Sequence, residues 1–179
     1  HLKEPQLYFP IMSLFFYIHN TPNSHKLLDF KRQHYIKEVV DYKPIKDYNS
    51  NILITARTLN QGQEQTSILF GKAISILDPI HYLLNNYNIS TTRNPLLPSN
   101  YSYNTYSKIN DMNNMAYIDV FFSYLCSELT IHDKSPSFPI YYGSSNGISN
   151  YIHDVSEDID ELKYHSGFKK LHKHIIIDS

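Results

Sequence analysis

The chain has 179 residues and a mass of 21.0 kDa, enough for one domain with a sizeable core, since 41% of its residues are apolar and 14% are aromatic. Sixteen Lys and Arg against 17 Asp and Glu leave a net charge of −1. This balance excludes an overall basic field for nucleic acid and an acidic tail. The residues are skewed toward 21 Ile, 16 Asn, 16 Tyr and 13 Lys, with only 3 Ala, 3 Arg and 5 Gly, a bias typical of an AT-rich genome.

The ends and the hydropathy of the chain carry three expectations. No stretch of 18 apolar residues occurs, so the sequence predicts no transmembrane span. The most apolar early segment, 7–18, contains a proline and lacks the basic flank and cleavage site of a signal peptide, so we expect it in the core. Because the chain begins at His1 rather than Met, we expect it to be part of a longer gene product.

The first half of the chain predicts one helix and two strands. Ser24 can cap a helix over 24–40, whose apolar side chains form a broad stripe among charged ones. After a turn at Lys43-Pro44, residues 51–55 predict a short strand. The clearest strand is 66–77, in which the even-numbered positions from Ile68 to Ile76 share one face with Lys72.

The second half predicts further elements separated by an irregular region at 88–114. Asp78 and Pro79 begin a short helix as cap and first-turn residue. Residues 115–130 are apolar nearly all round, which favours a central buried helix. Three shorter elements follow: strands at 138–143 and 148–152, and a helix at 156–162 with acidic residues in its first turns.

Strands and helices therefore alternate irregularly, which favours an α+β fold over a doubly wound sheet. We expect a small mixed or antiparallel sheet with a central apolar helix. The predicted organisation is an N-terminal helical extension over 1–50 and an α+β region over 51–179, with the two forming one compact domain as an alternative.

Three stretches of the chain resemble, in amino-acid sequence, one group of proteins. They are Phe70-Gly71-Lys72 with Leu77-Asp78-Pro79-Ile80, residues 103–110 with 114–119, and Ser135-Pro136-Ser137-Phe138-Pro139-Ile140-Tyr141-Tyr142-Gly143-Ser144. The group is the serine/threonine kinase-like proteins of the large cytoplasmic DNA viruses, of the mimivirus and iridovirus types. The resemblance covers about residues 60 to 162, including the acidic run 154–158, and implies the small N-terminal lobe of a protein kinase.

The resemblance implies a role for Lys72. In kinases, the lysine of this strand holds the nucleotide phosphates and pairs with a glutamate on the long helix, which is the residue type of Glu128. Lys72 also interrupts an otherwise apolar strand face, and a buried lysine needs a partner or a ligand; the alternative is that it extends into solvent at a sheet edge. The helix offers Asp119 and Glu128 as partners, of which only one can face Lys72 because they are nine residues apart.

The departures from the kinase pattern are substantial. The five glycines form no G-x-G-x-x-G phosphate loop. The pairs His132-Asp133 and His153-Asp154 lack the Asn of a catalytic loop, and Asp29-Phe30 continues with a lysine instead of a glycine. We therefore expect no catalytic residue in this chain and no phosphate transfer by it. ATP and magnesium are implied only for a full-length protein, and no cofactor is predicted for this chain.

For each of the other candidate sites, a purely structural role is the preferred interpretation. Cys126, the single cysteine, excludes an internal disulfide and lies in an apolar helical run, which favours a buried inert thiol over a nucleophile. For a cluster of histidines near the C-terminus, a polar strand that faces water is preferred to a metal site. For the lysines near the same end, a solvated surface is preferred to a contact with nucleic acid. The residues concerned are His165, His172, His174 and Asp178 for a metal, and Lys169, Lys170 and Lys173 for nucleic acid.

Two functions follow as expectations. The first is a fragment of a viral serine/threonine kinase-like protein, virion-associated and not catalytically competent as this chain, with Lys72 and either Glu128 or Asp119 as its nucleotide-binding residues. The alternative is a non-enzymatic minor capsid or core protein. Either would have other virion proteins as partners, through contacts such as Tyr101, Tyr103 and Tyr106. The expected location is the virion or the host cytoplasm.

Overall fold

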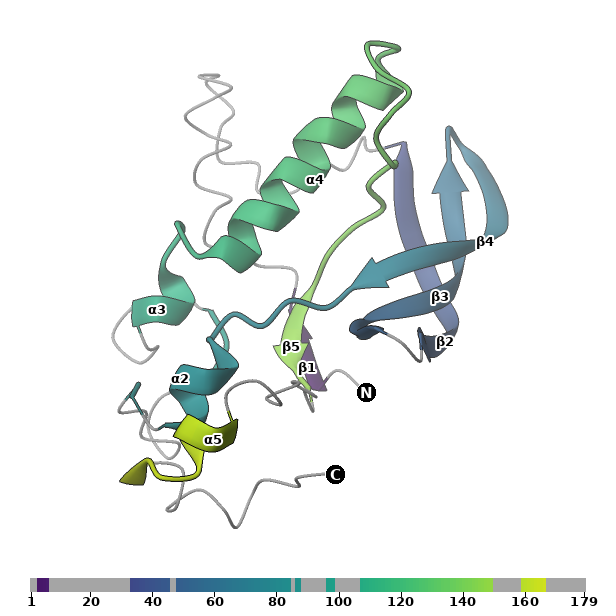
Figure 1. The fold of residues 1–179 in the computed structure, drawn as a ribbon. Coiled ribbons are helices and arrows are strands. Elements are labelled where there is room, and N and C mark those ends of the chain that lie inside the picture. The colour runs from purple at the N-terminus through teal and green to yellow at the C-terminus, as the bar shows by residue number, and fades with distance from the viewer. Residues whose placement is uncertain are drawn as a thin grey trace.

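The structure, a computed structural model, describes residues 3–6, 33–45, 48–84, 86–87, 96–98, 107–149 and 159–166. Within these ranges the protein is α+β, as the sequence predicts. A three-stranded antiparallel sheet lies beside one long helix, and two short strands pair with each other in a second, separate sheet (Figure 1).

The three-stranded sheet is an antiparallel meander of β2 (His34–Ile45), β3 (Tyr48–Asn60) and β4 (Gln63–Lys72), with β3 in the centre. The β3–β4 hairpin turns on Gln61 and Gly62, whose φ angles are 48° and 84°. Two successive positive φ angles are typical of a type I′ turn, whose twist matches that of the flanking strands. The ten residue pairs between β3 and β4 follow one another without a shift in register.

The helix expected over 24–40 is wrong for the part that the structure describes, because residues 34–40 belong to β2. This segment contains Tyr35, Ile36, Val39 and Val40, which suit a strand at least as well as a helix. Pairing with β3 decides between the two, and that pairing is invisible in the local sequence. Residues 24–32 lie outside the described ranges.

The two strands expected in the middle of the chain both form, with different bounds. The strand at 51–55 is the centre of the longer β3. The strand at 66–77 begins earlier, at Gln63, and ends at Lys72, so residues 73–77 are not part of it.

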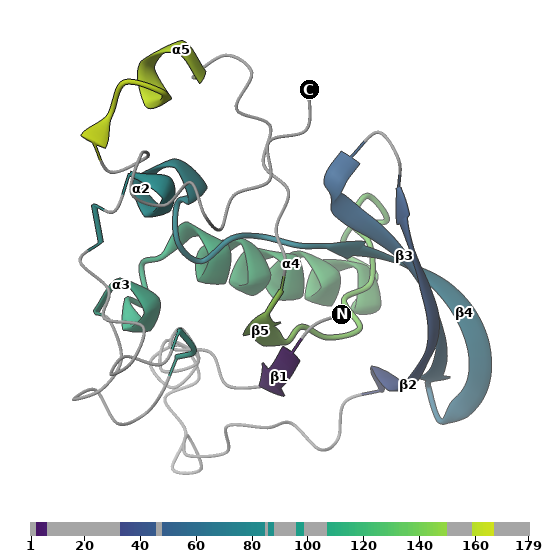
Figure 2. The same ribbon diagram turned by 90° about the horizontal axis from the view of Figure 1, so that it is seen from below.

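The register divides the sheet into two faces. The outer face contains Leu53, Ile68, Phe70 and Lys72, and the opposite, inner face contains the fully buried Ala56 and Thr58. On the inner face the Tyr142 hydroxyl donates to Asn60 Oδ1 at 2.8 Å, and the Tyr142 ring meets His34 edge to face. The segment that follows the long helix thus covers the inner face near the end of the sheet that carries the β3–β4 hairpin (Figure 2).

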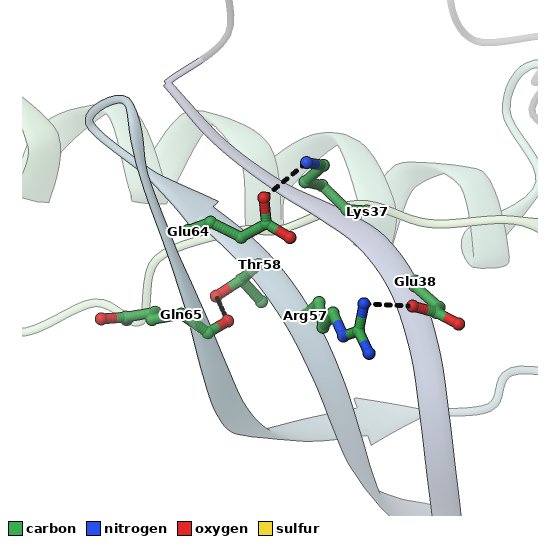
Figure 3. A network of polar contacts seen from close by, with 6 residues as sticks. All are labelled: Lys37, Glu38, Arg57, Thr58, Glu64 and Gln65. Atoms are coloured by element: carbon green, nitrogen blue, oxygen red, sulfur yellow. Dashed lines mark hydrogen bonds and ion pairs between the residues drawn. The ribbon is translucent and has the colours of Figure 1, made fainter.

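Charged side chains gather toward the hairpin end of the outer face (Figure 3). Lys37 of β2 reaches across β3 to Glu64 of β4 at 2.7 Å. Arg57 of β3 and Glu38 of β2 lie 3.3 Å apart. The hydrogen bond with Lys37 lowers the pKa of Glu64, and the same bond raises the pKa of Lys37.

The long helix α4 (Met115–Ile131) confirms the helix expected at 115–130. Asn114 caps its start, with Oδ1 accepting from the Ala116 N–H at 3.0 Å. At its end, Asp133 has a φ of 56°, and the N–H groups of Asp133 and Lys134 donate to the carbonyls of Thr130 and Leu129. These two hydrogen bonds form a Schellman motif, which provides donors for carbonyls that have no partner within the helix.

The apolar composition of α4 predicts a helix that is buried on all sides, but only part of its surface is buried. Tyr117 and Phe121 are the buried centre of a small core to which Ile76, Ile118, Val120 and Leu125 add partly buried side chains. On other sides of the helix, Met115 is 74% exposed and Phe122 is 58% exposed. Apolar composition alone therefore overstates how much of α4 is covered.

Three short helices complete the described part of the chain. The expected helix after Asp78 is α2 (Pro79–Leu83), capped by the Asp78 carboxylate accepting from the His81 N–H at 3.0 Å. Within the region expected to be irregular lies α3 (Ser107–Asn110). The helix expected at 156–162 is described only as α5 (Ile159–Leu162).

The strand expected at 138–143 is wrong. The segment is not in a sheet, because side chains of α4 take the place of a strand partner: Thr130 Oγ1 donates to the Phe138 carbonyl at 2.8 Å, and Ser127 Oγ accepts from the Tyr141 N–H at 2.8 Å. The next strand, β5 (Asn146–Ile148), pairs antiparallel with β1 (Lys3–Gln6), so it lies slightly before the position expected for it.

Several expectations concern residues outside the described ranges. They are the apolar segment 7–18, the contacts of Tyr101, Tyr103 and Tyr106, the acidic run 154–158, the residues 150–152, the lysines Lys169, Lys170 and Lys173, and the metal candidates His172, His174 and Asp178.

Candidate functional site

The candidate site is built where the third strand of the sheet meets the long helix. Lys72 is the last residue of β4 and is paired with Asn51 of β3, near the start of that strand. It therefore lies at the end of the sheet where β2 passes into β3. The remaining chain from residue 73 to residue 114 leads to the start of α4, which returns beside this end of the sheet (Figures 1 and 2).

Asp119 is the residue of α4 that meets Lys72. It lies one turn after Met115, the first residue of the helix. Lys72 Nζ donates to Asp119 Oδ1 at 2.9 Å, and the two side chains are 54% and 40% exposed. An ion pair with this much access to water contributes about 0.2–1 kcal/mol to stability. The pair thus connects the sheet to the helix without being a major source of stability.

Glu128 lies elsewhere. It follows Asp119 by nine residues, and its carboxylate lies 3.4 Å from Nε2 of His132, one turn further along the same helix. Of the two acids that the sequence offers, the structure brings Asp119 to Lys72 and pairs Glu128 with a histidine. Nine residues are two and a half turns, so Glu128 points to the opposite side of α4 from Asp119 and lies about 13.5 Å further along the helix axis.

Of the two alternatives for Lys72, burial is wrong: the side chain is 54% exposed at the end of the edge strand β4, which agrees with extension into solvent. The apolar face that Lys72 interrupts is the exposed one, with Ile68 74% and Phe70 63% exposed. The opposite face of β4, which includes Ser67, Leu69 and Gly71, is the partly buried one. At Gly71 a Cβ atom would come within 2.7 Å of the Ile52 side chain, its neighbour across the strand pair, so no larger residue fits there without a shift.

Exposed apolar side chains flank the ion pair on both elements. On β4, Phe70 precedes Lys72 by two residues and shares its face. On α4, Met115 and Phe122 lie within one turn of Asp119. The ion pair is therefore a charged contact in an otherwise apolar and accessible surface, which is the composition of a contact surface more than of a closed pocket.

The chemistry open to this arrangement is anion binding. A lysine ammonium has three N–H donors, and Asp119 is the partner of one of them. The carboxylate holds the ammonium in position at the sheet end, and a phosphate oxygen can accept from the remaining donors. Lys72 is the one residue of the pair that can contact such an anion, and Asp119 would act by positioning it.

Asn114 is a functional residue of the site that no local sequence pattern singled out, although it belongs to one of the kinase-like stretches. Besides capping α4, its Nδ2 donates to the carbonyls of Ile76 at 2.7 Å and Lys108 at 3.2 Å. It is 7% exposed. One side chain thus fixes the start of α4 to the segment after β4, and so sets the level at which Asp119 faces Lys72. An Asn directly before an apolar helix is a cap signal, but its tertiary contacts have no sequence signal.

The remaining candidates are simple to place. Cys126 is a free thiol and is partly, not fully, buried. Among the described residues, which include His165, no three His, Cys, Asp or Glu side chains gather as a metal site would require. None of the helices in the described ranges is long and apolar enough to span a membrane.

Comparison of the chain with known protein families, with curated proteins and with solved structures gives no match.

Proposed function

We propose that residues 34–148 form a small lobe like that of the serine/threonine kinase-like proteins of large DNA viruses, and that this chain does not itself transfer phosphate. The observation that carries the proposal is the ion pair between Lys72 and Asp119. In a kinase small lobe, a strand lysine paired with a glutamate on the following long helix positions the phosphate-binding group. The partner here is an aspartate, so the contact matches the family in its position and departs from it in residue type.

The order of elements supports the same proposal. Three antiparallel strands form a meander, the third strand ends in the lysine, and the long helix follows. Lys72 also lies at the end of the sheet where the first and second strands are joined, which is where a phosphate-covering loop would have to be. The proposal thus rests on one contact and on the topology around it.

The sequence of that junction supports the lack of catalysis. The two residues between β2 and β3 are Lys46 and Asp47, and no glycine lies between His34 and Asn60. A phosphate loop needs glycine so that its backbone N–H groups can come close to the phosphates. We therefore expect Lys72 to be retained as a positioned cation, while tight nucleotide binding is lost.

A thermal shift assay tests the nucleotide claim. Mg-ATP is added to the purified chain, to Lys72→Ala and to Lys43→Ala, a control that removes an exposed lysine from the outer face of β2. We expect little or no change in the melting temperature of any of them. A shift of several degrees that Lys72→Ala abolishes and Lys43→Ala retains would contradict the proposed lack of nucleotide binding.

The reading frame downstream of Ser179 tests the family. A continuation that contains His-x-Asp-x-x-x-x-Asn and Asp-Phe-Gly would support a kinase-like parent protein. A stop codon, or a tail without these residues, would contradict it and would favour the second function.

The second function is a non-enzymatic minor structural protein of the virion. The observation that favours it is the exposed apolar surface on both elements of the site, which includes Ile68, Phe70, Met115 and Phe122. Apolar side chains exposed in a group mark a surface that another protein covers. On this reading other virion proteins are the partners, and the ion pair serves only to join strand and helix.

A further inference from the structure

The two edges of the three-stranded sheet differ in how well they are protected against pairing with another strand. β2 has three register shifts against β3, and it contains Pro44 and the lysines Lys37 and Lys43. Bulges, proline and lysine are the devices by which edge strands avoid association. The free edge of β2 is therefore unsuited to accepting a further strand.

β4 has none of these devices over its central part. It pairs with β3 over ten successive residues without a bulge, contains no proline, and has its one lysine at its last position. Among the described residues it pairs with no strand other than β3, and it lies at the border of the described fold in Figure 2. Within the described part of the chain it therefore offers a long and regular row of backbone donors and acceptors without a strand partner.

The side chains on the outer face of β4 are complementary to themselves in one register. They are, in order, Glu64, Thr66, Ile68, Phe70 and Lys72, and all five are exposed. Two copies of a strand that pair antiparallel are related by a two-fold axis through one residue, because residues directly opposite each other must lie on the same face. The register is therefore defined by the residue on the axis.

An axis through Ile68 places Glu64 of each copy opposite Lys72 of the other. It also places Ile68 opposite itself and Thr66 opposite Phe70. An axis one residue earlier would put Glu64 opposite Phe70, and an axis one residue later would put Lys72 opposite Thr66. Only the register centred on Ile68 pairs both charges, and opposite charges directly across a strand pair are stabilising.

We propose that the free edge of β4 binds a second copy of this chain, in an antiparallel pair centred on Ile68 that extends the sheet to six strands. The existing ion pairs fit this arrangement. Lys37 contacts Glu64, and Asp119 contacts Lys72. At each end of the interface, Lys37 and Glu64 of one copy then meet Lys72 and Asp119 of the other, so that four charges alternate in sign. The exposed Ile68 and Phe70 side chains of both copies lie between the two ends. The proposal does not depend on the kinase-like function.

Charge reversal tests the register. E64K creates two lysine pairs in a dimer of that variant, and K72E creates two glutamate pairs, so we expect each to associate at least about tenfold more weakly than the wild type. In an equimolar mixture, however, a heterodimer places both lysines of the E64K chain opposite the two glutamates of the K72E chain. Sedimentation velocity over a concentration series is expected to show association of the wild type and of the mixture at concentrations where each variant alone is monomeric.

Matched variants complete the test. K43E changes the charge as much as K72E does but lies on β2, and is expected to associate as the wild type does. With Cys126 replaced by serine, Ile68→Cys is expected to form a disulfide-linked dimer on mild oxidation, while Thr66→Cys is expected to form far less, because its own copy lies four residues away along the pair. Far-UV circular dichroism checks that each variant is folded.

Four results would overturn the proposal. The wild type could stay monomeric at every concentration, the mixture could behave as the sum of its two components, or the two cysteine variants could cross-link equally. Sensitivity to K43E alone would place the interface at the other edge of the sheet and would overturn it as well.

Discussion

Replacing Asn114 separates the local role of a helix cap from its role in tertiary structure. Its Oδ1 accepts from the Ala116 N–H at 3.0 Å, and its Nδ2 donates to the carbonyls of Ile76 and Lys108 at 2.7 and 3.2 Å. The residue is 7% exposed, so water cannot readily replace a lost partner. Asn114→Ala removes all three contacts, and Asn114→Asp removes only two of them.

The magnitudes follow from the contacts. Losing the cap costs about 1 kcal/mol, and losing a donor to a buried carbonyl costs about 1 kcal/mol for each of the two, so Asn114→Ala is expected to lower the free energy of unfolding by about 3 kcal/mol. Aspartate caps a helix as well as asparagine does and suits the helix dipole. It nevertheless places an oxygen against two carbonyl oxygens, so we expect a loss of about 2 kcal/mol.

Urea unfolding followed by far-UV circular dichroism at pH 7 measures both values. The control is Asn113→Ala, an exposed neighbour whose side chain is expected to matter by less than about 0.5 kcal/mol. If Asn114→Asp unfolds within about 0.5 kcal/mol of the wild type, the contacts with Ile76 and Lys108 do not hold α4 in place, and the reasoning is refuted.

Three further changes test separate parts of the fold. Tyr117→Phe removes the hydroxyl that donates to the buried Ile109 carbonyl at 2.6 Å, and is expected to lower the free energy of unfolding by about 1–2 kcal/mol in the urea assay; an unchanged midpoint would contradict this. The pKa of Glu64 is held below its ordinary value of 4.5 by Lys37, so the pair stabilises the fold above that range and its contribution is lost as the pH falls through the lowered pKa. The melting temperature of Glu64→Gln is therefore expected to lie below that of the wild type at pH 7 and to equal it in acid, and a difference that grows in acid would show the wrong sign. Gly62→Ala meets no neighbouring atom but requires a φ of 84°, so it is expected to cost about 1 kcal/mol, and Gly62→Asn less; equal costs would exclude backbone strain as the cause.

Local sequence was sufficient for the elements whose signals are local. The bounds of α4 follow from the apolar run over 115–130, and the start of α2 follows from Asp78 and Pro79. The centre of β3 and most of β4 follow from alternation and β-branched residues. The candidate site was likewise within reach as a set, because a lone lysine on an apolar strand face and two acids on one helix are visible without coordinates.

Tertiary structure decided what depends on partners distant in sequence. β2 is a strand because β3 pairs with it, although its own residues also fit a helix. The segment 138–143 is not a strand because Ser127 and Thr130 of α4 bind its backbone.

The faces and the ion pair were decided in the same way. Alternation along β4 separates two faces but cannot tell which is covered, so the sequence left open whether Lys72 is buried or extends into solvent, and its side chain is 54% exposed. The spacing of Asp119 and Glu128 shows that only one can meet Lys72, and the level at which α4 passes the end of β4 selects Asp119. Periodicity is a property of one segment, whereas burial and pairing are properties of two.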